Sequence, residues 1–213
     1  MARDPDIPPP RLYLITPPLA AAEPFLDALR AALAAGDVAC VLARLATPDP
    51  GEKKKIARAL GAATAQTDAA LLIDGDPQLA ARAGADGAHL DATDTEALDA
   101  AIAALKPDRI VGAGQLPTRD ACMAAGERDV DYLMFGGPDD PSTAHDVRER
   151  AEWWAGIFNV PCVAYAHTLE DVEALARVGV EFVALERAVW ADPRGPAAAV
   201  DAAAMALKTG TSP

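Results

Sequence analysis

Residues 71–94 read LLIDGDPQLAARAGADGAHLDATD, in which two short apolar runs flank one short amphipathic segment. We interpret this stretch as a strand, a helix over 76–84 and a second strand. Asp76 suits the N-cap of the helix and Pro77 its first position, because aspartate accepts bonds from free backbone N–H groups and proline has no N–H to leave free. Continuous apolar strands are typical of a parallel sheet covered on both faces.

The same alternation of strand and helix runs through the chain from residue 11 to residue 208. Strands are expected at 11–16, 37–45, 69–74, 87–90, 109–113, 130–136, 161–165 and 180–185. Helices are expected at 23–36, 51–67, 76–84, 93–106, 118–127, 143–158, 168–179 and 195–208. Alternation gives a doubly wound sheet or a closed barrel, and eight units favour a (β/α)8 TIM barrel. We expect a single domain over 1–213, with 1–10 as a lead-in and 209–213 as a frayed tail.

Composition and charge exclude several classes of partner. The chain has 213 residues, 51% of them hydrophobic, and a net charge of -13. This charge argues against binding to nucleic acid or to an anionic membrane surface. No apolar run approaches the ~20 residues of a membrane span, and the N-terminus has no hydrophobic signal core. The three cysteines show no CxxC spacing, so we expect buried free thiols and a cytoplasmic location.

The loops after the strands are where a barrel of this kind carries its function. Asp74 and Asp91 follow adjacent strands, and with Asp94 they could form an oxygen-ligand site for Mg²⁺ or Ca²⁺. The alternative is that Asp76 and Asp94 are helix N-caps and the other two are solvated loop acids.

Other strand ends carry further candidates. Arg44 is a candidate catalytic and ligand-binding residue, or else a structural partner of a neighbouring loop acid. His167 could act as a general acid or base, with an incidental loop histidine as the alternative. Glu186 is expected at the same edge. His89 lies within a strand and is expected in the core, and His145 is expected to be solvated.

Trp153 and Trp154 are adjacent in one predicted helix and cannot share a face of it. One is expected to pack on the barrel. The other indicates a subunit contact, and so a homo-oligomer, or else a large exposed aromatic.

Several segments carry a family resemblance. RLYLIT (11–16), the stretch 71–94, RIVGA (109–113), VDYLMFG (130–136) and ADP (191–193) occur in the order found in thiamine-phosphate synthase and its relative, the thiazole tautomerase TenI. The chain resembles this family over nearly its whole length. The resemblance implies a cytoplasmic barrel enzyme that joins a pyrimidine pyrophosphate to a thiazole phosphate, uses magnesium and expels pyrophosphate.

The resemblance also implies site residues, most of which differ here. Of the family's Gln-x-Arg-Glu-Lys run only Arg44 is retained, and the position of one magnesium-binding aspartate is Gly75. Asp94 matches the other magnesium ligand. Elsewhere the family's serine, the tautomerase histidine, the Gly-Gly phosphate turn and the small hydroxyl residues are replaced by Gly114, Gly137, Ala166-His167 and Glu186-Arg187.

We therefore expect a divergent family member without standard synthase activity. It would bind a small molecule, such as a pyrimidine or thiazole of the thiamine pathway, at the C-terminal mouth of the barrel, and it would need no cofactor. The expected ligand-binding residues are Arg44, Asp74, Asp91, Gly136, His167 and Glu186. The alternative is an active but divergent transferase of the thiamine-phosphate synthase type, with Mg²⁺ held by Asp94, Asp74 and Asp91.

Overall fold

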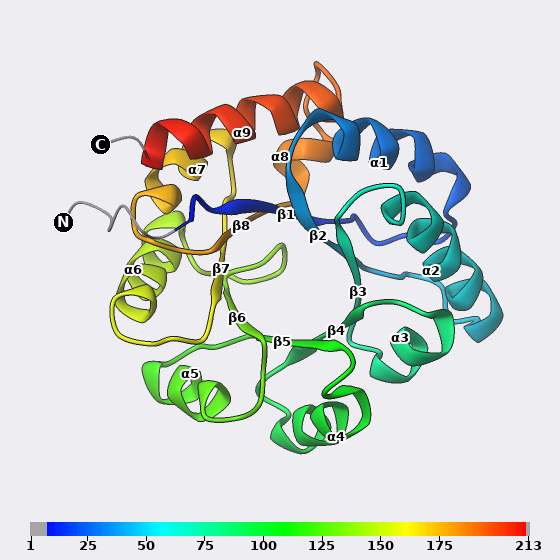
Figure 1. Ribbon diagram of the computed structural model, residues 1–213, viewed down its shortest axis with the longest axis horizontal. Helices are drawn as coiled ribbons and strands as arrows, with labels where there is room; N and C mark the ends of the chain where they lie inside the picture. The colour runs from blue at the N-terminus through cyan, green and yellow to red at the C-terminus, as the bar shows by residue number, and fades with distance from the viewer. Residues whose placement is uncertain (1–7, 212–213) are drawn as a thin grey trace.

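Eight parallel strands close into a barrel (Figure 1), as the alternation predicts. The computed structural model describes residues 8–211. Each strand pairs with the next, and β8 pairs with β1 to close the ring. The strands are β1 (Arg11–Ile15), β2 (Val38–Ala43), β3 (Ala70–Asp74), β4 (Gly87–Asp91), β5 (Ile110–Gly114), β6 (Tyr132–Phe135), β7 (Cys162–Tyr165) and β8 (Phe182–Leu185).

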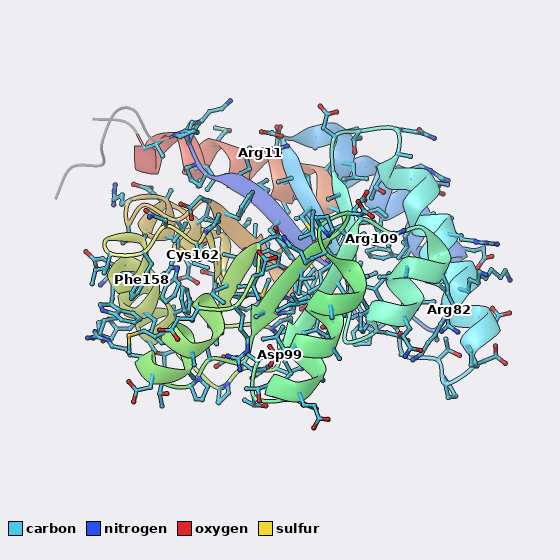
Figure 2. All side chains as sticks on the ribbon, turned by 60° about the horizontal axis from the view of Figure 1, so that its bottom comes forward. Arg11, Arg82, Asp99, Arg109, Phe158 and Cys162 are labelled. Carbon is cyan, nitrogen blue, oxygen red and sulfur yellow. The ribbon has the colours of Figure 1, made fainter. Side chains whose placement is uncertain are left out.

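The helices form an outer ring around the barrel (Figure 1). Within residues 8–211 they are α1 (Glu23–Ala35), α2 (Pro50–Thr64), α3 (Pro77–Ala83), α4 (Thr95–Leu105), α5 (Arg119–Gly126), α6 (Ala144–Ala155), α7 (Leu169–Ala176), α8 (Arg187–Trp190) and α9 (Pro196–Thr211). The single turn α8 was not predicted, because four residues carry too little periodicity to indicate a helix. Exposed charged side chains cover the outer helices, as Arg82 on α3 and Asp99 on α4 illustrate (Figure 2).

The two ends of the chain differ from expectation in one respect. The tail was predicted to fray from residue 209, but α9 continues to Thr211, where the threonine hydroxyl bonds to the Leu207 carbonyl at 3.1 Å. Residues 212–213 and most of the expected lead-in, 1–7, lie outside the described residues.

Local capping chemistry agrees with the sequence. The Asp76 carboxylate accepts a bond from the Leu79 N–H at 2.8 Å, and Pro77 opens α3. Thr168 and Asp171 form the capping box at the start of α7. These bonds satisfy backbone donors that a helix start leaves free, and so they set where the helices begin.

The inside of the barrel holds a buried polar chain. The hydroxyls of Tyr13 and Tyr132 lie 2.8 Å apart, and Tyr132 Oη is 3.0 Å from His89 Nδ1. His89 is 8% exposed, which confirms that it is a core histidine. Gly112 makes room for this chain, because a Cβ there would lie 2.0 Å from Tyr132 Cζ.

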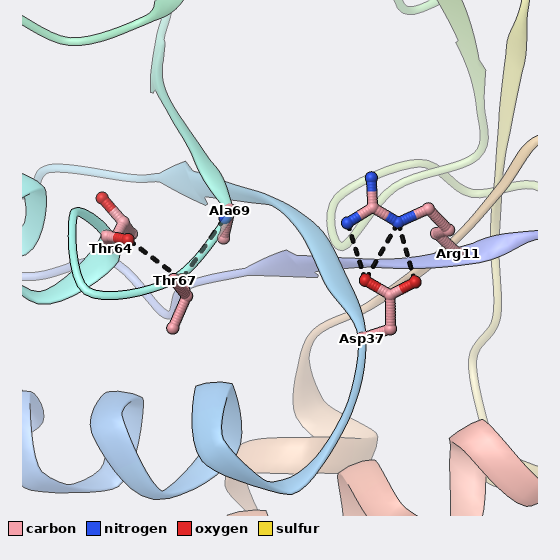
Figure 3. Close-up of polar contacts among 5 residues, drawn as sticks. All are labelled: Arg11, Asp37, Thr64, Thr67 and Ala69. Atoms are coloured by element: carbon pink, nitrogen blue, oxygen red, sulfur yellow. Dashed lines mark hydrogen bonds and ion pairs between the residues drawn. The ribbon is translucent and has the colours of Figure 1, made fainter.

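The N-terminal end of the barrel is tied by side chains. Arg11 at the start of β1 bonds Asp37, which precedes β2, at 2.6 to 3.0 Å (Figure 3). Nearby, the Thr67 hydroxyl donates to the Thr64 carbonyl and accepts from the Ala69 N–H, which orders the turn into β3 (Figure 3). These contacts belong to the face that stabilises a barrel rather than to the face that carries function.

The cysteines and the two adjacent tryptophans lie largely as the sequence predicts. Cys40, Cys122 and Cys162 are free and buried, as predicted. Trp154 is buried against the barrel, whereas Trp153 is partly covered by Arg119, whose guanidinium carbon lies 4.7 Å from the ring centroid. A subunit contact at Trp153 stays a prediction. In the described part of the chain, no helix is long and apolar enough to cross a membrane.

Candidate functional site

A cavity of about 200 Å³ opens at the carboxyl ends of strands β1 to β6. We call it the mouth cavity. Its charged lining residues are Arg44, Asp74, Asp91 and Asp139. Gly136 lines it as well, so four of the six predicted ligand-binding residues meet there. Sequence positions at the ends of neighbouring parallel strands converge in this way because all strands end at the same edge.

Arg44 is held firmly at the end of β2. Its backbone N–H donates to the buried Thr16 hydroxyl at 3.0 Å, and its carbonyl accepts from the Leu19 N–H at 2.8 Å. The guanidinium pairs with the Asp139 carboxylate, and its Nε lies 4.0 Å from Asp74 Oδ2. Arg44 therefore lines the mouth cavity and also pairs with a loop acid. The sequence had offered these as two alternatives, and the structure shows both contacts.

Asp74 and Asp91 share one wall of the mouth cavity. Asp74 pairs in register with His89 on β4, and Asp91 lies two residues further along that strand. Side chains alternate along a strand, so both carboxylates belong to the inward-facing set. Burial raises the pKa of Asp74, and the nearby Arg44 partly opposes this effect.

Asp94 does not line the mouth cavity with Asp74 and Asp91. Its carboxylate accepts a bond from the Ala97 N–H at 3.0 Å and caps helix α4. Between residues 8 and 211, no three His, Cys, Asp or Glu side chains are grouped so that they could hold a metal ion. The expected trio of Asp74, Asp91 and Asp94 is therefore not assembled, because the helix start competes for Asp94 and the alternative N-cap interpretation holds for it.

His167 and Glu186 lie apart from the mouth cavity, around Tyr165. Neither residue lines the cavity. The His167 ring meets the Tyr165 ring edge-on with centroids 5.0 Å apart. Its Nε2 is the one buried side-chain nitrogen or oxygen in the described chain without a hydrogen-bond partner. Such an atom is uncommon, because most buried polar atoms in folded proteins are hydrogen-bonded, and a catalytic role for His167 stays a prediction.

Tyr165 is a candidate that the sequence did not reveal. Burial raises its pKa to about 12, with Glu186 and Asp139 adding to the rise and Arg44 opposing it. Its hydroxyl is therefore protonated at neutral pH. It lies beside the mouth cavity, because a Cβ on Gly136, which lines that cavity, would sit 3.1 Å from Tyr165 Cβ. The only sequence signal was its place as the last residue of a strand.

Gln115 is a second residue that the sequence did not single out within its loop. Its φ of 56° places a non-glycine residue in the left-handed region, which is uncommon. It lines both the mouth cavity and a neighbouring cavity of about 530 Å³ at the outer rim. Strained residues of this kind concentrate at functional sites.

Known proteins match this chain along most of its length. A family model described as thiamine monophosphate synthase matches residues 12–189. The thiamine-phosphate synthase of Rhodospirillum centenum is 39% identical over 196 residues, covering 89% of this chain and 94% of that protein. That of Hyphomonas neptunium is 35% identical, covering 90% and 91% of the two chains.

Two solved structures share the fold. A thiamine phosphate pyrophosphorylase from Pyrococcus furiosus superposes with a TM-score of 0.79 at 21% identity, over 95% of this chain and 97% of that one. A 3-hexulose-6-phosphate synthase superposes with a TM-score of 0.73 at 16% identity, over 92% and 99%. At these identities the two structures bear on the fold alone.

Proposed function

Because the chain belongs to the thiamine monophosphate synthase family, we propose that it is an active, altered thiamine-phosphate synthase that joins a pyrimidine pyrophosphate to a thiazole phosphate. The observation that carries this proposal is the near-complete match to relatives named as thiamine-phosphate synthases. This match favours an active transferase. The missing family residues had instead indicated a protein without synthase activity. The mouth cavity supplies the place where the reaction would occur.

Arg44 is the residue that would bind the leaving pyrophosphate. A guanidinium offers several N–H donors in a plane, which suits two oxygens of one phosphate group. It is the one cationic side chain of the mouth cavity among the described residues. Bonds from its backbone to Thr16 and Leu19 fix the position from which its side chain enters the cavity. Donors placed in advance on a leaving group lower the barrier because they stabilise charge that develops in the transition state.

Asp74 and Asp91 are the residues that would hold a magnesium ion. Both are hard oxygen donors on one wall of one cavity, and Mg²⁺ is commonly bound by one or two carboxylates, with waters and substrate phosphates completing its shell. The residues therefore fit the ion without a third carboxylate. The ion would neutralise negative charge on the pyrophosphate.

Tyr165 would contribute a neutral hydroxyl at the edge of the site. With a pKa of about 12 it keeps its proton throughout the neutral range, and so it can donate a hydrogen bond to a ligand oxygen. His167 beside it is a candidate for moving a proton at its unpartnered Nε2.

The test is formation of thiamine phosphate from the two substrates with Mg²⁺, compared between wild type and Arg44→Gln. We expect turnover in wild type and a loss of about 10²-fold in Arg44→Gln, the usual cost of removing one charge-stabilising donor. Arg30→Gln is the matched control, because Arg30 lies on α1, outside the mouth cavity, and pairs with Asp27. Absence of product in wild type at every Mg²⁺ concentration would refute the proposal.

A second candidate function is non-catalytic binding of an uncharged or cationic small molecule. The observation that favours it is the charge of the mouth cavity, where three carboxylates face one guanidinium that is already paired. Unphosphorylated pyrimidine or thiazole alcohols would suit such a cavity better than their phosphates. Calorimetry that shows tighter binding of the phosphorylated forms would exclude this candidate.

A further inference from the structure

The loop that follows β6 holds Asp139 at a defined place above the mouth cavity. Gly136 leaves the strand with a φ of 77°, and a Cβ there would lie 2.7 Å from Val147 Cγ2. The loop then turns back on itself, because the Asp140 N–H donates to the Gly137 carbonyl at 3.3 Å. Asp139 is therefore presented at the tip of a tight turn, directly after Gly136, whose backbone conformation favours glycine.

The far end of the loop is anchored as well. The Asp140 carboxylate accepts a bond from the Ser142 N–H at 2.7 Å, and the Ser142 hydroxyl bonds the Arg150 guanidinium. Arg150 in turn donates to the Leu116 carbonyl at 2.8 Å. Asp140 thus stabilises the conformation of the loop. It lines the outer rim cavity and does not line the mouth cavity.

The Arg44–Asp139 pair has unequal partners. The Arg44 side chain is 17% exposed, whereas the Asp139 side chain is 75% exposed. The carboxylate can therefore return to water at little cost, while the guanidinium stays in the cavity. Arg44 also keeps a partial counter-charge when Asp139 leaves, because Asp74 remains 4.0 Å away.

We propose that Asp139 is a specificity-determining residue whose carboxylate competes with incoming anions for the Arg44 guanidinium. A phosphate or pyrophosphate group enters the mouth cavity by displacing this carboxylate, and its affinity is reduced by that exchange. The same exchange speeds release of an anionic product. This inference deepens the proposed function and rests on it only for the identity of the substrate, since anion exchange at Arg44 needs no chemistry.

The experiment measures the Kd of inorganic pyrophosphate by calorimetry at low salt, with and without Mg²⁺. Asp139→Asn is compared with Asp140→Asn, which removes the same charge one residue away and can keep the bond from the Ser142 N–H through its amide oxygen. Arg44→Gln and the double variant of Arg44→Gln with Asp139→Asn complete a double-mutant cycle. Circular dichroism melts confirm that each variant is folded.

We expect Asp139→Asn to bind pyrophosphate roughly three- to fivefold more tightly than wild type, the scale of a partly exposed ion pair. The gain should shrink as salt is added, should be absent in Asp140→Asn and should vanish in the Arg44→Gln background. Equal gains in the two aspartate variants, a gain that survives without Arg44, or no pyrophosphate binding to Asp139→Asn would each overturn the inference.

The inference and the proposed function fail in different ways. If wild type makes no thiamine phosphate but the Asp139→Asn gain is present, only the proposed function is refuted. If wild type makes thiamine phosphate and Asp139→Asn binds pyrophosphate no better than wild type, only the role of Asp139 is refuted.

Discussion

Replacing Gly112 by alanine should destabilise the barrel severely. A Cβ at this position would lie 2.0 Å from Cζ and 2.3 Å from Oη of Tyr132. The Tyr132 ring cannot move aside easily, because it is buried and its hydroxyl bonds both Tyr13 and His89. The strain must therefore be relieved by breaking this polar chain or by moving β5 away from β6.

The size of the loss follows from two contributions. Overpacking of a dense core costs about 1–3 kcal/mol. Two buried hydrogen bonds to Tyr132 are worth roughly 1 kcal/mol each when they are lost. We expect Gly112→Ala to lower the free energy of unfolding by about 3–5 kcal/mol, a large fraction of the stability of a typical domain.

The assay is urea unfolding followed by circular dichroism, with a cycle that includes Tyr132→Ala. Because Tyr132→Ala removes the atoms that the new Cβ would meet, the double variant should be no less stable than Tyr132→Ala alone. Gly61→Ala is the control. Gly61 lies inside helix α2, and its new Cβ would sit at an ordinary contact distance of 3.6 Å from Leu71 Cδ2. This substitution should stabilise the protein by up to about 1 kcal/mol, because alanine favours a helix more than glycine does. A Gly112→Ala loss below about 1 kcal/mol, or losses that add in the double variant, would refute the reasoning.

Two further predictions concern Asp94 and the tyrosines. Asp94→Ala should lower stability by about 1 kcal/mol, because the Ala97 N–H loses its cap, and should leave Mg²⁺ affinity unchanged; a weaker Mg²⁺ Kd measured by calorimetry would show instead that Asp94 is a ligand. Burial raises the pKa of Tyr13, Tyr132 and Tyr165 in the native state, that of Tyr165 to about 12. Above pH 10 the unfolded chain therefore releases protons that the native protein keeps, so stability should fall as pH rises. Tyrosinate absorbance at 295 nm should appear together with loss of the circular dichroism signal; its appearance in folded protein near pH 10 would contradict this.

Capping and periodicity were predictable because they depend on neighbours in the chain. Asp76, Pro77 and the Thr168–Asp171 box act within one helical turn. The turn α8 escaped prediction, since a four-residue helix is set by how the chain leaves β8 and returns to the barrel. The role of Asp94 was left open by the sequence, because a cap and a metal ligand need the same carboxylate, and only its bond to Ala97 distinguishes them.

The candidate site was predictable as a set of positions but not as a set of contacts. Arg44, Asp74 and Asp91 were expected at the mouth because they follow parallel strands, and all three line its cavity. The pairing of Arg44 with Asp139 joins residues 95 positions apart. No pattern within the sequence indicates which of several loop acids reaches that guanidinium.

The order of strands and helices, the closed barrel that eight such units form and the residues at the strand ends all follow from the amino-acid sequence. They follow from it because hydrophobic periodicity and helix caps are local, and because parallel strands must end at a common edge. The folded barrel was needed to see which charges neutralise each other and why Gly112 must be glycine beside Tyr132. It also shows that His167 packs on Tyr165 and that neither His167 nor Glu186 lines the mouth cavity. Those outcomes depend on distances of a few ångströms between loops that are far apart in the sequence. Closure of the barrel sets these distances, and no local sequence pattern indicates them.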